Sequence, residues 1–205
     1  MRQIITSETK RVLEQIAESF LIKKFYLAGG TALAIQLGHR QSIDLDWFSA
    51  GKFSNAEIKN ALTKVWVFKL TSEEEGTIHG ILNGVKVSFL FYGYGMLYPL
   101  VDYKNVRLAD ERDIAAMKID AVSSRGSKKD FIDIYFLLEK YSLSELIGFF
   151  EKKYKKIKFN KLHILKSLVY FEDAEKEPMP LMIKKDGWEQ IKKRISKETN
   201  KIIKW

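Results

Sequence analysis

Two aspartates one residue apart, Asp44 and Asp46, lie within the otherwise apolar stretch SIDLDWF. Alternate side chains of a β-strand point to one face, so these carboxyls would project together, about 6–7 Å apart along the strand. Burying two unpaired carboxylates is costly. A divalent cation between them would remove that cost, and Mg²⁺ is typically held by one or two carboxylates together with substrate phosphates. The spacing therefore predicts a metal site, with an exposed strand edge as the plain structural alternative.

The dipeptide Gly29–Gly30 precedes these aspartates, and thirteen residues separate Gly30 from Asp44. It follows an apolar, strand-like run and precedes a helix-like one. Backbone N–H groups at such a turn, and the N-terminus of the helix behind it, can bind a phosphate, and Thr31 could add a hydroxyl. A glycine pair alone is usually only a turn, but its combination with the aspartate strand favours a site for a metal-bound nucleotide.

A second group of charged residues lies in the run DIAAMKIDAVSSRGSKKDFIDIYFLL. Lys118 and Arg125 are seven residues apart and share a helix face, where they could meet phosphates. Asp130 and Asp133 are three apart and also share a face. One acid could orient Lys118 while the other acts as a base. The structural alternative is a salt bridge that joins these cations and acids between helices.

The elements that must position these residues follow from hydrophobic periodicity and from capping and turn signals. Ser7 and Ser54 are expected helix N-caps, Gly38 a helix end, and Asn83–Gly84 a hairpin turn. Helices are expected over residues 7–20, 31–38, 55–65, 110–126, 128–141, 142–154, 160–176 and 186–205, and strands over 24–30, 42–49, 65–74, 77–83, 85–93 and, more briefly, within 104–110.

This order of elements predicts an α+β fold in two parts. Residues 1–109 would form a mixed sheet with helices, and residues 110–205 a helical bundle that completes the active site and carries the basic C-terminal helices. Within the aspartate strand, Ile43, Leu45 and Trp47 would point away from the carboxyls and into the core. Residues 175–186 are the clearest linker.

Composition excludes several classes of protein. Of the 205 residues, 46% are hydrophobic, which is too many for a disordered chain. Cysteine is absent, so there is neither a disulfide framework nor thiolate chemistry, and a cytoplasmic location fits. The N-terminus does not read as a signal peptide, and no apolar run approaches the ~20 residues that span a bilayer, so no membrane association is expected.

Charge is concentrated near the C-terminus. The net charge is +9, and residues 151–205 hold 16 Lys and Arg against 8 Asp and Glu. Such a segment favours an anionic partner, nucleic acid first, although a solvated lysine-rich surface has the same composition.

The two charged blocks together resemble the nucleotidyltransferase superfamily signature. The stretch GGTALAIQLGHRQSIDLDWF and the later run through FIDIYFLL are similar to the AbiEii/AbiGii toxin branch with its MenT-like members, over about Tyr26 to Leu138. The resemblance implies a nucleotidyltransferase-type mixed sheet followed by helices. It also implies an Mg²⁺-dependent nucleotidyltransferase, with Mn²⁺ as an alternative ion, that uses an NTP.

The resemblance also implies roles for particular residues. Asp44 and Asp46 would bind the metal, and the nucleotide would contact Gly29, Gly30, Thr31 and Arg125. Lys118 would be a catalytic or nucleotide contact, and Asp130 or Asp133 would be a required acid. His39 and Arg40 would contact phosphate or acceptor, with a structural role for the histidine equally open. One departure is Ser88, which occupies a strand position where many superfamily members carry a third acid, often the general base.

The implied reaction is transfer of an NMP to an acceptor hydroxyl. The resemblance suggests RNA, in particular a tRNA 3′ end, as the acceptor and a toxin of a toxin–antitoxin or abortive-infection system, with a cognate antitoxin as partner. Two alternatives stay open: a nucleotidyltransferase for a small molecule or protein, and a non-catalytic nucleotide- or RNA-binding module with this fold.

Overall fold

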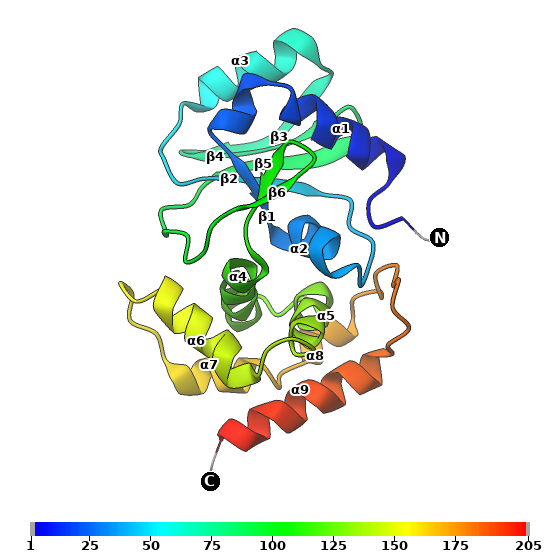
Figure 1. Cartoon of the computed structure of the whole chain (residues 1–205), viewed down its shortest axis with the longest axis vertical. Coiled ribbons are helices and arrows are strands. Elements are labelled where there is room, and N and C mark those ends of the chain that lie inside the picture. The colour runs from blue at the N-terminus through cyan, green and yellow to red at the C-terminus, as the bar shows by residue number, and fades with distance from the viewer. Residues whose placement is uncertain (1–2, 204–205) are drawn as a thin grey trace.

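A computed structural model describes residues 3–203 of the chain. Figure 1 shows the sheet with its helices in one half and a group of helices in the other. The elements are α1 (Ser7–Ala17), η1 (Phe20–Lys23), β1 (Tyr26–Ala28), α2 (Gly29–Leu37), β2 (Leu45–Ser49), α3 (Asn55–Val65), β3 (Phe68–Glu74), β4 (Thr77–Leu82), β5 (Val85–Phe91), β6 (Val101–Tyr103), β7 (Val106–Leu108), α4 (Glu111–Ser124), α5 (Lys128–Leu137), α6 (Leu143–Lys153), α7 (Lys161–Ser167), α8 (Glu172–Glu175) and α9 (Trp188–Ile202).

The predicted mixed sheet is confirmed, with the strand order β3-β4-β5-β2-β1-β7-β6. Strand β2 runs parallel to β5 and antiparallel to β1, so it occupies the centre of the sheet. Leu45 and Trp47 are fully buried, as expected, whereas Ile43 is 50% exposed. The expectation for Ile43 is wrong because β2 begins at Leu45 and the preceding residues form a loop.

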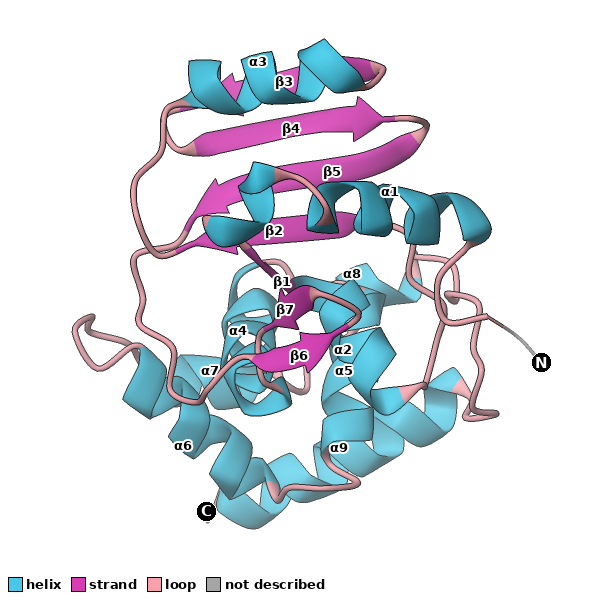
Figure 2. Cartoon of the chain, turned by 45° about the horizontal axis from the view of Figure 1, so that its top comes forward, coloured by secondary structure: helices cyan, strands magenta, loops and turns pink. Residues whose placement is uncertain are grey.

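Helices α1 and α3 lie across one face of the sheet (Figure 2). Along β5, Val87 and Phe89 are buried on that side, while Lys86 and Ser88 point the other way and are exposed or half-buried. The opposite face of β2, β5 and β4 is therefore partly open. Helix α2 packs against α4 and α5, which joins the helical half to the sheet. Within residues 3–203, no helix has both the length and the apolar character needed to cross a membrane.

Several local signals are confirmed. The Ser54 side chain caps α3 by accepting from the Glu57 N–H. Gly38 ends α2 with a left-handed backbone, φ 63°. Asn83 and Gly84 both have positive φ, as a two-residue hairpin between twisted strands requires.

Other local predictions are wrong. Thr6 rather than Ser7 caps α1. The helix expected over 160–176 breaks into α7 and α8, and just before α8 Phe171 packs onto the Trp188 ring. Strand β6 was not anticipated. The expected linker over 175–186, by contrast, is found as the irregular connection between α8 and α9, and its Ile183 N–H donates to the His39 carbonyl.

Candidate active site

Asp46 lies in the central strand, beside the turn that starts α2. In the sheet register it is opposite Ala28 on β1 and Ser88 on β5. Gly29 has φ +69°, and a Cβ at this position would lie 2.9 Å from Oδ2 of Asp46. Glycine is therefore required twice over, by the left-handed backbone and by the close approach of the carboxyl. The predicted proximity of the glycines and the aspartate strand is confirmed.

Asp44 stands in the loop before β2 and is held there through its main chain. The Thr31 hydroxyl donates to the Asp44 carbonyl and is 2.8 Å from the Ser42 hydroxyl. Thr31 is 2% exposed, and it belongs to the lining of the cavity beside Gly30 and Arg40. Its hydroxyl positions Asp44, and its expected contact with a phosphate stays a prediction.

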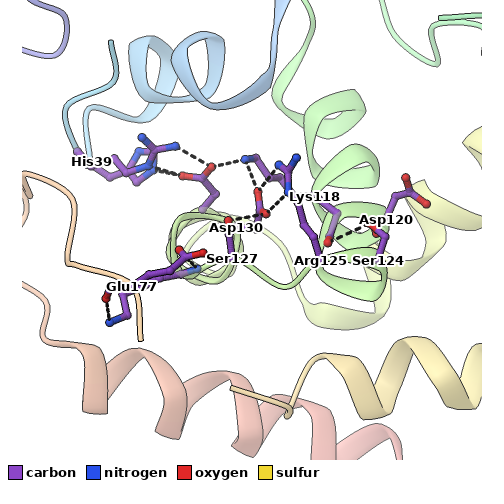
Figure 3. A network of polar contacts seen from close by, with 12 residues as sticks. His39, Lys118, Asp120, Ser124, Arg125, Ser127, Asp130 and Glu177 are labelled. Atoms are coloured by element: carbon purple, nitrogen blue, oxygen red, sulfur yellow. Dashed lines mark hydrogen bonds and ion pairs between the residues drawn. The ribbon is translucent and has the colours of Figure 1, made fainter. Parts of the chain in front are cut away.

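Lys118 enters the site from α4 and is enclosed by acids. Its Nζ lies 2.8 Å from Oδ1 of Asp130 and 2.7 Å from Oδ2 of Asp133. Arg125, at the C-terminal end of α4, places Nε 3.0 Å from the other oxygen of Asp130 (Figure 3). The salt-bridge geometry named as the structural alternative is therefore present, and both acids orient Lys118.

Asp133 is completely buried and is bound from two further directions. His39 Nε2 lies 2.7 Å from Oδ1, and Arg40 donates through Nε at 2.8 Å and Nη2 at 3.0 Å. Burial alone would raise the pKa of Asp133, but Lys118, Arg40 and the hydrogen bond from His39 hold it well below its usual range. Burial also raises the pKa of Asp130, yet Lys118 and Arg125 lower it overall. Carboxylates held this acidic make poor general bases near neutral pH.

His39 is wholly buried, and burial lowers its pKa despite the neighbouring carboxylate. The neutral ring donates from Nε2 to Asp133, so His39 positions that acid and does not reach a phosphate or an acceptor. Arg40 has the same partner but also approaches the start of α2: a Cβ on Gly30 would lie 2.6 Å from its Nη2.

The pKa of Asp46 is shifted in the opposite direction to the pKa of Asp133. Burial, and then the charge of Asp44, raise the pKa of Asp46, and only the Ser88 hydroxyl, Lys118 and Arg125 oppose this. No group of three or more His, Asp or Glu side chains within residues 3–203 could hold a metal on its own. The donor set is therefore two carboxylates, which fits Mg²⁺ completed by phosphate oxygens and water.

Three cavities meet at Asp46. The cationic cavity, about 250 Å³, lies on the side of α2, α4 and α5 and is lined by Gly30, Asp44, Arg40, Lys118, Arg125 and Lys129 among others. The aromatic cavity, about 320 Å³, includes Gly29, Phe48, Lys118, Asp120, Tyr92 and Tyr154. The histidine cavity, about 210 Å³, lies over β3, β4 and β5 and includes Asp44, Thr71, His79, Lys86 and Ser88. Asp44 and Asp46 together line the first and third, so they do face one side.

Two site residues escaped the sequence analysis. His79 and Asp120 both line these cavities, but neither belongs to a recognisable motif. The available signal for His79 was its polar position in an alternating strand, between the buried residues Ile78 and Gly80. Asp120 had no local signal, because residues two apart in a helix, such as Lys118 and Asp120, do not face each other.

A glycine turn opening a helix, a D-x-D strand beside it in a mixed sheet, and a helical lysine closing the cleft define a nucleotidyltransferase-type fold. JHP933 from Helicobacter pylori has a similar structure, with TM-score 0.54 and 15% identity over 94% of this chain and 88% of that one. MenT4, a nucleotidyltransferase toxin from Mycobacterium tuberculosis, is similar with TM-score 0.52 and 12% identity over 95% and 84%. Similarity at this level of identity shows a shared fold.

The sequence comparisons define the family. The profile of the nucleotidyl transferase AbiEii toxins of type IV toxin–antitoxin systems matches residues 11–98 and 96–204. The Aquifex aeolicus protein aq_aa25 is 35% identical over 97% of this chain and 98% of its own length. The chain therefore belongs to the AbiEii family of nucleotidyltransferase toxins, as the resemblance in the sequence indicated.

Proposed function

We propose that the protein transfers an NMP from an NTP to an acceptor hydroxyl of RNA, with a tRNA 3′ end as the first candidate. One observation carries the reaction type: the Asp46 carboxyl lies against Gly29, and Asp44 and Asp46 both line the cationic cavity without an ion pair to any residue in 3–203. Membership of a toxin–antitoxin family supports a toxic role in the cytoplasm, restrained by a cognate antitoxin.

The triphosphate is expected in the cationic cavity. Helix α2 begins at Gly29 with no side-chain cap on its free N–H groups, and such a helix end favours an anion. Lys118 and Arg125 border the same space and supply positive charge. Asp130 and Asp133 keep Lys118 aimed at it, and Arg40 holds Asp133. Both the 1–109 and the 110–205 parts contribute, which supports treating them as two domains of one active site.

The metal role belongs to Asp44 and Asp46, which would hold Mg²⁺ or Mn²⁺. When bound, the ion supplies charge neutralisation of the phosphate oxygens. The chain's own residues then orient the substrate so that the acceptor oxygen forms a bond to the α-phosphorus while the bond to pyrophosphate breaks. Phosphoryl transfer of this kind depends chiefly on positioning and electrostatics.

An RNA acceptor is favoured over a small molecule by charge. The net charge of +9 lies mostly within residues 151–205. Contacts to a nucleic-acid backbone release counterions, so affinity for RNA should fall steeply between 50 and 200 mM salt, by about 10³-fold or more if six or more phosphates are contacted. A flat salt response would favour a small-molecule or protein acceptor.

The experiment that tests the function is incubation of the protein with each α-labelled NTP, total tRNA and Mg²⁺ or Mn²⁺. We expect label on RNA with at least one nucleotide, and none with the Asp46→Asn variant. Label on protein or on a small molecule would identify the rival enzyme. If no combination transfers label, the non-catalytic binding module is the correct interpretation.

A further inference from the structure

His79 stands in a cross-strand row with the metal-site aspartate. Asp46 pairs with Ser88 between β2 and β5, and Ser88 pairs with His79 between β5 and β4. Residues that are directly opposite in adjacent strands point to the same face. The three side chains therefore project together onto the open face of the sheet, and His79 and Ser88 line both the aromatic and the histidine cavities with Asp46.

The contacts along this row indicate which ring nitrogen of His79 carries the proton. Ser88 is directly opposite Asp46 in the sheet, and its hydroxyl lowers the pKa of that carboxyl. A carboxylate that holds a metal is ionised and can only accept, so the hydroxyl proton is directed to Asp46. The Ser88 oxygen lies 3.0 Å from Nδ1 of His79. Because its proton is already engaged, this oxygen must accept from Nδ1–H. In the neutral ring the lone pair is then on Nε2, which no described residue hydrogen-bonds.

The side from which the acceptor hydroxyl must attack the α-phosphorus determines where a general base is needed. Attacking and leaving oxygens lie roughly in line on opposite sides of the phosphorus. If pyrophosphate leaves into the cationic cavity beside Lys118 and Arg125, the acceptor arrives across β2, over β5 and β4. The histidine cavity occupies that position, and Lys86 at its edge could meet an acceptor phosphate.

Other titratable groups near the phosphorus are poorly placed for this task. Asp44 and Asp46 are the metal carboxylates, and Asp130 and Asp133 are bound to cations. Asp120 is the remaining carboxylate, with a pKa raised by burial; it lines the aromatic cavity but not the histidine cavity, where the acceptor is expected.

We propose that Nε2 of His79 is the general base that takes the proton of the acceptor hydroxyl, and that the surface of β4 and β5 receives the acceptor. As the acceptor oxygen bonds to the α-phosphorus, its proton moves to Nε2, the bond to pyrophosphate breaks, and Nδ1–H stays on Ser88. This role rests on the proposed nucleotidyl transfer and assigns the chain a base in place of a third carboxylate.

The kinetic test uses single-turnover transfer of α-labelled NMP to RNA by the full chain. His79→Gln can still donate an amide hydrogen bond to Ser88 but cannot take a proton, so we expect a loss of roughly 10²–10⁴-fold. NTP affinity should stay within about threefold of the wild type. His79→Ala should lose as much and regain activity when imidazole is added. His163→Gln, a histidine on α7 outside the three cavities, is the matched control and should retain full activity.

Several results would overturn the assignment. Wild-type rates in His79→Gln would do so, and so would a loss in His79→Ala that imidazole does not restore, or a loss confined to Asp120→Asn. A wild-type protein that transfers no label overturns the proposed function itself, which is a different outcome from an active wild type with an active His79→Gln variant.

A second readout does not depend on turnover. Nitrogen NMR of the ring at pH 8, where an uncoupled imidazole is neutral, reports the tautomer directly. We expect Nδ1 protonated and Nε2 bare in His79, with the signal assigned by its loss in His79→Gln. In Ser88→Ala the preference for this tautomer should weaken. A proton on Nε2 in the wild-type ring would contradict the proposal whatever the kinetics show.

Discussion

Asp44–Asp46 and Asp130–Asp133 are both pairs of nearby carboxylates, but the protein surrounds them differently. Asp133 is buried against Lys118 and Arg40, and Asp130 against Lys118 and Arg125. Asp46 forms no ion pair within residues 3–203, and burial and the charge of Asp44 raise its pKa. The chain itself neutralises Asp130 and Asp133, whereas Asp44 and Asp46, the proposed metal carboxylates, have no such ion pair among the described residues.

This difference in surroundings indicates a positioning role for Asp130 and Asp133 and a ligand-binding role for Asp44 and Asp46, although all four acids lie near the same site. A buried carboxylate with its cations in place has a lowered pKa and little capacity for another ligand. A carboxylate whose pKa is raised by burial and by a like charge gains from a divalent cation. The two pairs should therefore respond in opposite ways when one acid is replaced by its amide.

The largest effect is expected for the Asp46→Asn substitution, which should reduce the rate of nucleotidyl transfer. Removing half of the metal carboxylates should reduce transfer by about 10³-fold or more, equivalent to about 4 kcal/mol of transition-state stabilisation. Stability should not fall, since the change relieves repulsion between Asp44 and Asp46. Label transfer and the denaturation midpoint are measured on the same preparation. Asp102→Asn, an exposed residue of β6, is the matched control, and near-normal turnover in Asp46→Asn would refute the metal role.

Asp133→Asn is expected to damage folding instead. Removal of one partner from a buried ion pair leaves Lys118 and Arg40 without compensation, which typically costs about 3–5 kcal/mol. Urea denaturation measures the change in unfolding free energy. Asp173→Asn, in an exposed pair with Lys176, should stay within about 0.5 kcal/mol of the wild type. If Asp133→Asn were as stable as the control, the contrast between the two pairs would be lost.

Lys118→Met links the two regions, because Lys118 contacts the neutralised pair and borders the cationic cavity. Arg40 still pairs with Asp133 and Arg125 with Asp130, so folding should survive. We expect kcat/KM for the NTP to fall about 100-fold, or about 2.7 kcal/mol, with a clear increase in the NTP dissociation constant. An unchanged dissociation constant and rate would make Lys118 a purely structural residue.

The local signals in the sequence predicted most of the elements and the proximity of the glycine pair to Asp46. The glycine pair, Asp46 and the Asn83–Gly84 turn are each found where expected, whereas Asp44 lies in the loop before β2 and not in the strand. The prediction that Ile43 is buried was wrong, because the residue at which a strand begins depends on its neighbouring strands and not on the alternation of polar and apolar residues alone. The bond from the Thr31 hydroxyl to the Asp44 carbonyl was not predicted either, since the loop that it anchors is not visible in the local pattern.

Contacts between distant segments could not be predicted in this way. His39 and Asp133 are 94 residues apart, and nothing near either residue specifies the other. The row from Asp46 to His79 depends on β5 lying beside β2, although α3, β3 and β4 intervene in the chain. A polar residue in one strand acquires a role only when register and strand order are known.

The smallest expected effect is a difference in how the stability contributions of Asp46 and Asp133 depend on pH in the ligand-free protein. The folded-state pKa of Asp46 is raised, so its penalty is present above that pKa and disappears as Asp46 takes up a proton at lower pH. The folded-state pKa of Asp133 is lowered, so its stabilising contribution persists above the unfolded value of about 3.9 and is lost only as pH falls through the lower folded value.

Between pH 7 and pH 4, the stability advantage of Asp46→Asn over the wild type should therefore shrink toward zero, whereas the deficit of Asp133→Asn should change little. Urea midpoints of the three proteins at several pH values measure both trends. Parallel curves for the two variants would mean that the carboxylate pairs have the same electrostatic surroundings. Because the measurement needs no substrate, that outcome would remove the basis for assigning metal binding to one pair and positioning to the other.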